Sequence, residues 1–233
     1  MLVTTNPSLL NTSQCMGSVQ PLVMLVRDHD SSDLQTFEAL LSITNLASFS
    51  DNTKQRIVAE RGLPIFSYAM FSNNAMIRRA ATEAMSNLFP NEKMISYLRG
   101  HENLKVWIAF ASDFEEHYEC ARAALGCLAM VSQDLPIANE ITKASNAESM
   151  MKTVLESGNL DLMHRMLIVV LNLIEHGGKC KDLILSTGTF AFCEAYAQTY
   201  QNGGEEHELK LSPSDMKMMK TTVDLAKEIV LAS

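Results

Sequence analysis

Acidic residues beside histidine are the first candidates for chemistry in this chain. Glu115, Glu116 and His117 are consecutive, and Glu175 precedes His176. Neighbouring positions on a helix point in different directions, so these side chains are not placed to act together as acid and base. The chain also has no HExxH or CxxC spacing and no glycine-rich phosphate-binding motif. We therefore expect no catalysis, no metal and no cofactor.

Asparagine recurs at one register of the long apolar segments. Four windows align: Thr36–Leu46 (TFEALLSITNL), Arg78–Leu88 (RRAATEAMSNL), Tyr118–Leu128 (YECARAALGCL) and Met163–Leu173 (MHRMLIVVLNL). Their shared register holds Asn45, Asn87, Cys127 and Asn172, in steps of 42, 40 and 45 residues. A period near forty, carried by a long apolar helix, is typical of armadillo and HEAT repeats.

An asparagine inside a helix needs an explanation, because its side chain competes with the helical hydrogen bonds. Two interpretations stay open. The amide bonds an adjacent loop or the neighbouring repeat, or it lines a concave face and bonds the backbone of an extended peptide, since it offers both donor and acceptor. Residues four and eight before each asparagine share its helix face. The predicted binding face therefore comprises Phe37, Leu41, Asn45, Arg79, Glu83, Asn87, His164, Ile168 and Asn172.

Three-helix units are expected to position this face. The predicted helices cover residues 19–27, 34–49, 51–61, 63–71, 74–88, 91–99, 103–112, 115–131, 136–143, 147–157, 160–176, 180–186, 190–201 and 213–232. Asp33 and Asp51 are predicted N-caps, and Gly62 a helix stop. We expect residues 1–17 to be an irregular lead-in. Residues 18–233 are expected to form one all-α armadillo domain, a right-handed solenoid of four to five three-helix repeats with a polar insertion at 202–212.

Composition narrows the class of protein further. Hydrophobic residues make up 47% of the chain, enough for a packed core, and the formal charge of −8 disfavours binding to nucleic acid. No signal peptide is visible and no apolar stretch reaches eighteen residues, so we expect no membrane contact. The five scattered cysteines are expected to be reduced, as in a cytoplasmic protein.

One family resemblance goes beyond the generic repeat. The segment FEALLSITNLASFSDNTKQRIVAERG (residues 37–62) resembles the most characteristic stretch of the UCS-domain myosin chaperones, in their animal, muscle-associated branch. RRAATEAMSNLFP and LIVVLNLIEHGG are similar to that family at matching distances. The likeness extends from about Val19 to the C-terminus and is weakest in the last helix. The chain looks like the C-terminal part of a UCS armadillo array.

The resemblance implies a cytoplasmic chaperone that can associate with the sarcomere and that holds the myosin motor domain during folding and thick-filament assembly. In the family, Hsp90 binds through a tetratricopeptide domain, and this chain has no 34-residue repeats of that kind, so Hsp90 docking is not expected here. Two other classes stay open: an armadillo adaptor for a linear peptide of another partner, and a structural spacer.

Overall fold

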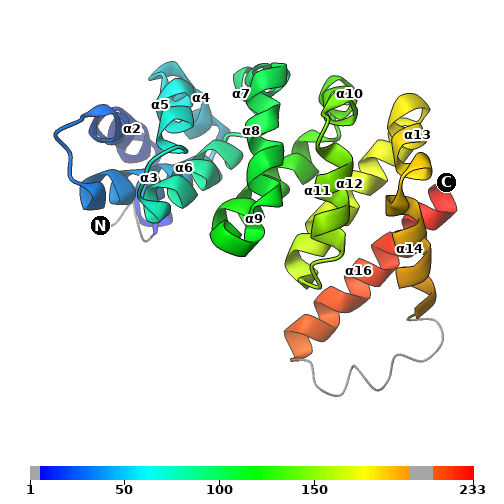
Figure 1. The fold of residues 1–233 in the computed structure, drawn as a ribbon. Coiled ribbons are helices and arrows are strands. Elements are labelled where there is room, and N and C mark those ends of the chain that lie inside the picture. The colour runs from blue at the N-terminus through cyan, green and yellow to red at the C-terminus, as the bar shows by residue number, and fades with distance from the viewer. Residues whose placement is uncertain (1–5, 200–211) are drawn as a thin grey trace. The chain divides into compact units, whose positions relative to one another are not determined.

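The computed structural model describes residues 6–199 and 212–233, and all of its regular elements are helices. The predicted insertion at residues 202–212 lies, except for Ser212, outside the described residues. Figure 1 shows these helices, labelled in chain order. By its internal contacts the described chain divides into two compact units. Unit 1 comprises residues 6–98 and 115–124, and unit 2 comprises residues 99–114, 125–199 and 212–233. Whether they act as the single predicted domain stays a prediction.

Unit 1 contains a short 3-10 helix and six α-helices. These are η1 (Pro7–Leu9), α2 (Thr12–Arg27), α3 (Asp33–Phe49), α4 (Asp51–Ala59), α5 (Gly62–Ala69), α6 (Ala75–Ser86) and α7 (Glu92–Leu98). In this unit α3 packs between α2 and α6, and α4 and α5 cover the same core. The long helix α9 (Phe114–Val131) adds its first part, residues 115–124, to unit 1.

Unit 2 holds the rest of α9 and seven further helices. They are α8 (His101–Ser112), α10 (Leu135–Lys143), α11 (Ala147–Leu155), α12 (Leu160–His176), α13 (Gly178–Ser186), α14 (Gly188–Thr199) and α16 (Pro213–Ala232). In this unit α12 packs on α11, α13 and α16, and α14 also packs on α16. Together α10, α11 and α12 form a complete three-helix repeat, as predicted, because amphipathic helices of this kind can bury their apolar sides only against one another and the next repeat.

The helix starts are explained by local capping. Ser32 accepts from the amide of Gln35, and Gln35 bonds back to the amide of Ser32, so Ser32 forms a capping box before α3. Ser50 caps α4 by accepting from the amide of Thr53. The predicted caps Asp33 and Asp51 are therefore each one residue late: both are the first residue of their helix, where a carboxylate favours the helix dipole.

The prediction of an irregular lead-in over residues 1–17 is wrong for its second part. Helix α2 begins at Thr12, seven residues before the predicted start, because Asn11 and Gln14 form a capping box. Pro21 consequently lies inside the helix rather than in its first turn. It is tolerated on an exposed side of α2, while Cys15, Val19 and Val23 are buried on the other side.

Gly62 is not the helix stop that the sequence predicts. The chain turns at Arg61, which has a left-handed backbone with φ 64°, and Gly62 is the first residue of α5. A Cβ at Gly62 would lie 2.8 Å from the carbonyl oxygen of Ile57 and 2.9 Å from the ring of Phe66. Gly62 is therefore needed for close packing between α4 and α5, and not for an unusual φ.

Candidate protein-binding face

In unit 1 the predicted face lies on two adjacent helices. Phe37, Leu41 and Asn45 belong to α3, which packs against α6. Phe37 and Leu41 are half-buried rather than part of the closed core. We call this set, with Arg79, Glu83 and Asn87 of the α6 segment, the unit 1 face.

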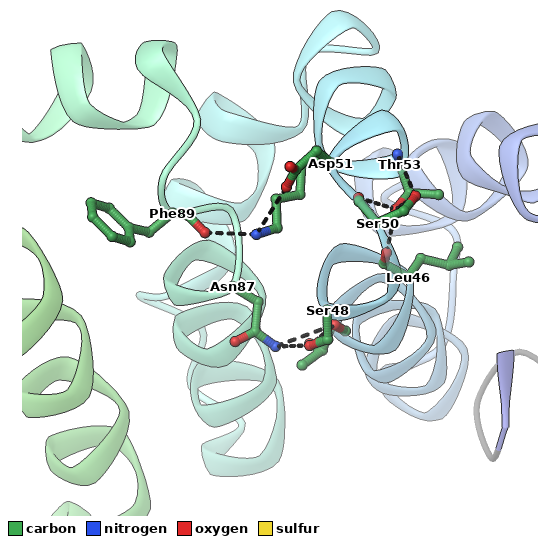
Figure 2. A network of polar contacts seen from close by, with 9 residues as sticks. Leu46, Ser48, Ser50, Asp51, Thr53, Asn87 and Phe89 are labelled. Carbon is green, nitrogen blue, oxygen red and sulfur yellow. Dashed lines mark hydrogen bonds and ion pairs between the residues drawn. The ribbon is translucent and has the colours of Figure 1, made fainter. Parts of the chain in front are cut away.

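Asn87 joins the two helices of the unit 1 face. Its Nδ2 donates to Ser48 Oγ at 2.8 Å and to the Thr44 carbonyl oxygen at 3.2 Å, both on α3 (Figure 2). Asn87 is the C-cap of α6 and not an interior residue, since the helix ends at Ser86. These bonds place the Asn87 turn beside the Asn45 turn of the preceding repeat. Asn45 itself is half-buried and has an interaction partner of its own.

Asn172 makes the same connection within unit 2. Its Nδ2 donates to Ser132 Oγ at 2.8 Å and to the Ala129 carbonyl oxygen at 3.1 Å. In both units the carbonyl acceptor lies 43 residues before the asparagine. Asn172 is only 8% exposed. The two amide nitrogens thus bond to the neighbouring repeat, which leaves the amide oxygens as the atoms that a ligand could use.

A second polar network holds the α3–α4 turn against the end of α6. Thr53 Oγ1 donates to the carbonyl oxygen of Leu46, near the end of α3 (Figure 2). Lys54 Nζ donates to the carbonyl oxygen of Phe89 at 2.8 Å and lies 3.6 Å from Asp51 Oδ1. Two consecutive residues of α4 thus bond the two neighbouring segments: Thr53 bonds α3, and Lys54 bonds the chain that follows α6.

The structure brings Arg79 and Glu83 together and adds a partner from α9. Arg79 Nε lies 3.1 Å from Glu83 Oε1, and Arg79 Nη2 lies 3.6 Å from Glu119 Oε2. All three side chains are partly exposed, so the pairs contribute little to stability. They do fix a mixed-charge group with two carboxylates around one guanidinium. Glu119 was recognisable only as the residue eight before Cys127 in the repeat register.

His164, Ile168 and Asn172 lie along α12 in unit 2, and we call them the unit 2 face. His164 and Ile168 are half-buried. Burial lowers the pKa of His164, and the nearby Arg165 charge lowers it further. Arg165 is held by Asp161, with Nε 3.2 Å from Oδ1.

Gly126 of α9 lies under Arg165. A Cβ at Gly126 would lie 2.6 Å from Arg165 Nη1, so the absence of a side chain at this position leaves room for the guanidinium. Sequence analysis missed this pairing, because neither residue falls in the asparagine register.

The acid–histidine pairs from the sequence have structural roles. His117 departs from helical geometry inside α9, and its Nε2 accepts from Arg78 Nη2 at 3.0 Å, since a guanidinium can only donate. His176 Nε2 lies 2.9 Å from the carbonyl oxygen of Ser132. Among the described residues no group of histidine, cysteine and carboxylate side chains could hold a metal. All five cysteines are buried, and burial raises the pKa of Cys193 to about 12.

Sequence comparison finds relatives among the UNC-45 chaperones, and no family model matches. The chain is 33% identical to Protein unc-45 homolog B of Xenopus tropicalis over 160 residues, which is 67% of the chain and 17% of that protein. It is 32% identical to the Homo sapiens protein of the same name over 161 residues, with the same coverage. The chain thus spans about a sixth of the length of the relatives that it matches.

The fold is shared with solved armadillo proteins. UNC-45 from Drosophila melanogaster superimposes with a TM-score of 0.84 at 22% identity, covering 99% of this chain and 27% of that one. A designed armadillo repeat protein in complex with the peptide (KR)4 gives 0.73 at 16% identity, covering 96% and 88%. An UNC-45 chaperone studied for binding and folding muscle myosin also gives 0.74 at 22% identity, covering 93% and 23%.

These findings define the class of protein. The chain has an all-α armadillo fold, as the forty-residue period predicts, and the families that it matches are non-catalytic. It is a homologue of the UNC-45 (UCS-domain) myosin chaperones and corresponds to one armadillo segment of those longer proteins. No helix of the described residues is long and apolar enough to cross a membrane.

Proposed function

We propose that this chain is a client-holding segment of a myosin chaperone and that its client is the myosin motor domain. Homology to UNC-45 supports the client, since a related chaperone is known for binding and folding muscle myosin. The proposal places the chain in the cytoplasm, in association with the sarcomere, and assigns no Hsp90 site to its armadillo helices.

The observation that carries the proposal is the composition of the unit 1 face. Two half-buried apolar side chains, Phe37 and Leu41, accompany the charged pair Arg79 and Glu83 on adjacent helices. Apolar side chains can bury surface against a client, while fixed polar groups give orientation. The Asn87 side chain supports this face. Its amide nitrogen donates to α3, and its amide oxygen is available to accept a hydrogen bond from an N–H group of the client.

The release of the client would follow from modest affinity, because the chain has no nucleotide motif to drive it. The polar bonds of such a face are worth roughly 0.5–1.5 kcal/mol each. The unit 2 face, with His164 and Ile168 beside a buried Asn172, would take a different part of the client.

The test is suppression of heat-induced aggregation of a myosin motor domain, comparing the wild-type chain with Phe37→Ser/Leu41→Ser. Leu231→Ser is the matched control, since Leu231 is 87% exposed at the end of α16. We expect protection by wild type and by the control, and its loss in the double variant while the circular dichroism spectrum stays helical. Equal protection by all three would move the client site away from the unit 1 face.

A structural role is the second candidate, because the nitrogens of Asn87 and Asn172 are both used inside the chain. This interpretation predicts that Asn87→Ala lowers the melting temperature and leaves motor-domain protection unchanged at a temperature where the variant is folded. Loss of protection under those conditions would instead assign the Asn87 oxygen to the client.

A further inference from the structure

The outward side of α2 carries apolar residues that the unit 1 core does not use. One side of α2 packs on α3, α4 and α5 and buries Cys15, Val19 and Val23. On the other side Met24 is 51% exposed and Leu25 is 37% exposed, and Pro21 is exposed one turn earlier. Exposed apolar side chains that gather on one helix side indicate an interaction surface.

These side chains line a cleft at the turn from α2 to α3. It has a volume of about 790 Å³ and is formed by Pro21, Met24, Leu25 and residues 27–30. The cleft lies on other residues than the unit 1 face, which is built from α3 and α6. Its size suits an anchoring side chain and part of the segment that carries it.

The rim of the cleft carries two aspartates, and hydrogen bonds to Asp28 shape it. Asp28 Oδ1 accepts from the backbone amide of Asp30 at 3.1 Å, and the Asp28 carbonyl oxygen accepts from the amide of Ser31 at 3.2 Å. Within the described part of the chain, no cation forms a salt bridge with Asp28 or Asp30. Two carboxylates thus stand beside an apolar floor, and Arg27 is the lining residue of opposite charge.

An apolar outer side is not required of a helix that ends a unit. In unit 2 the exposed positions of α16 include Lys217, Lys220, Asp224 and Glu228, which are all charged. The exposed side of α2 at the cleft, with Met24 and Leu25 beside Asp28 and Asp30, therefore differs in character from the exposed side of α16.

We infer that this cleft docks a short amphipathic segment of a partner protein, with an apolar anchor flanked by lysine or arginine. The anchor removes Met24 and Leu25 from water, and the cationic flanks meet Asp28 and Asp30. Such binding weakens with added salt, because the carboxylates are at the surface. The inference is independent of the client proposal, since it concerns different residues and a different kind of ligand.

The experiment measures fluorescence anisotropy of two labelled peptides titrated with the full chain. One peptide carries leucine at helical spacing with lysine at the other positions, and the second has glutamate in place of each lysine. The cleft variants are Met24→Ser/Leu25→Ser and Asp28→Asn/Asp30→Asn, the latter keeping a side-chain oxygen for the Asp30 amide. Matched controls are Leu231→Ser and Asp224→Asn/Glu228→Gln on the exposed side of α16.

We expect the lysine peptide to bind and each cleft variant to weaken it by about ten-fold, with the controls within about two-fold of wild type. Equal binding of the glutamate peptide, equal weakening by the α16 controls, or no binding of either peptide would overturn the inference. Concentration-dependent self-association of the wild type that Met24→Ser/Leu25→Ser abolishes would also overturn it, since a second copy of the chain would then be the occupant.

Discussion

Asn87 and Ser48 are joined across two successive repeats, with Asn87 Nδ2 donating to Ser48 Oγ at 2.8 Å. Asn172 and Ser132 repeat the relationship in unit 2 at the same distance. Both asparagines thus connect neighbouring repeats, whatever else their oxygens bind. A substitution at either asparagine is therefore expected to lower the stability of the chain as well as any binding through the amide oxygen.

Asn172→Ala should destabilise the chain more than Asn87→Ala. Asn172 is 8% exposed and Ser132 is fully buried, so the substitution leaves buried acceptors without a donor, whereas Asn87 and Ser48 have access to water. We expect losses of about 1–3 kcal/mol for Asn172→Ala and about 0.5–1.5 kcal/mol for Asn87→Ala in urea unfolding. Asn52→Ala, at an exposed position of α4, is the control. A larger loss for Asn87→Ala would contradict this order.

Arg61 and Gly62 should respond to substitution in opposite directions. Arg61→Gly relieves a left-handed backbone and should stabilise the chain by about 1 kcal/mol. Gly62→Ala places a methyl group 2.8 Å from the Ile57 carbonyl oxygen and should cost about 1–3 kcal/mol. Thermal unfolding of both variants measures the two signs, and stabilisation by Gly62→Ala would show that α4 and α5 can separate without cost.

The Arg99–Asp134 pair should make stability depend on acid. The Arg99 hydrogen bond, at 2.6 Å, lowers the pKa of Asp134 below its ordinary value of 3.8, and the amide of Ile137 acts in the same direction. A carboxyl group whose pKa is lowered on folding favours the folded state when ionised. Its contribution is present above about pH 4 and is lost as the pH falls through the lowered value.

The check is urea unfolding of wild type and Asp134→Asn at neutral pH and near pH 3. We expect wild type to be the more stable at neutral pH and the difference to shrink in acid. Asp224→Asn, which removes an exposed carboxylate of α16, should show no comparable change. If the difference in unfolding free energy between wild type and Asp134→Asn does not change with pH, the charge of Asp134 does not contribute to stability, and the prediction is wrong.

Gly126→Ala should raise the pKa of His164. The new methyl group displaces the Arg165 guanidinium, which lies 2.6 Å from the added Cβ, and so weakens the second cause of the lowered pKa. Burial of His164, the larger cause, is unchanged, so the value should stay below its ordinary 6.5. Titration of the imidazole signals by NMR measures the shift, with Gly17→Ala as control because a Cβ there meets nothing. An unchanged His164 pKa would show that Arg165 keeps its place.

The sequence by itself determined the fold class and nearly every helix. Apolar periodicity and a spacing near forty residues depend only on local pattern, and the match of Leu160–His176 to its predicted bounds follows from the long apolar run between Asn159 and Gly177. Two of the missed predictions have a local cause. Asn11 started α2 early, and Arg61 took the left-handed turn that glycine usually occupies.

The partners of the polar groups were decided only by tertiary structure. The sequence placed Asn87 and Asn172 in register but left open whether they bond a ligand or the next repeat; the packing of α6 on α3, and of α12 beside the end of α9, brought a hydroxyl and a carbonyl within reach of each nitrogen. The Arg165 guanidinium over Gly126 has no periodic signal, because it depends on how helices distant in sequence meet. Periodicity records which side of a helix is buried, whereas these hydrogen-bond partners depend on distances between helices.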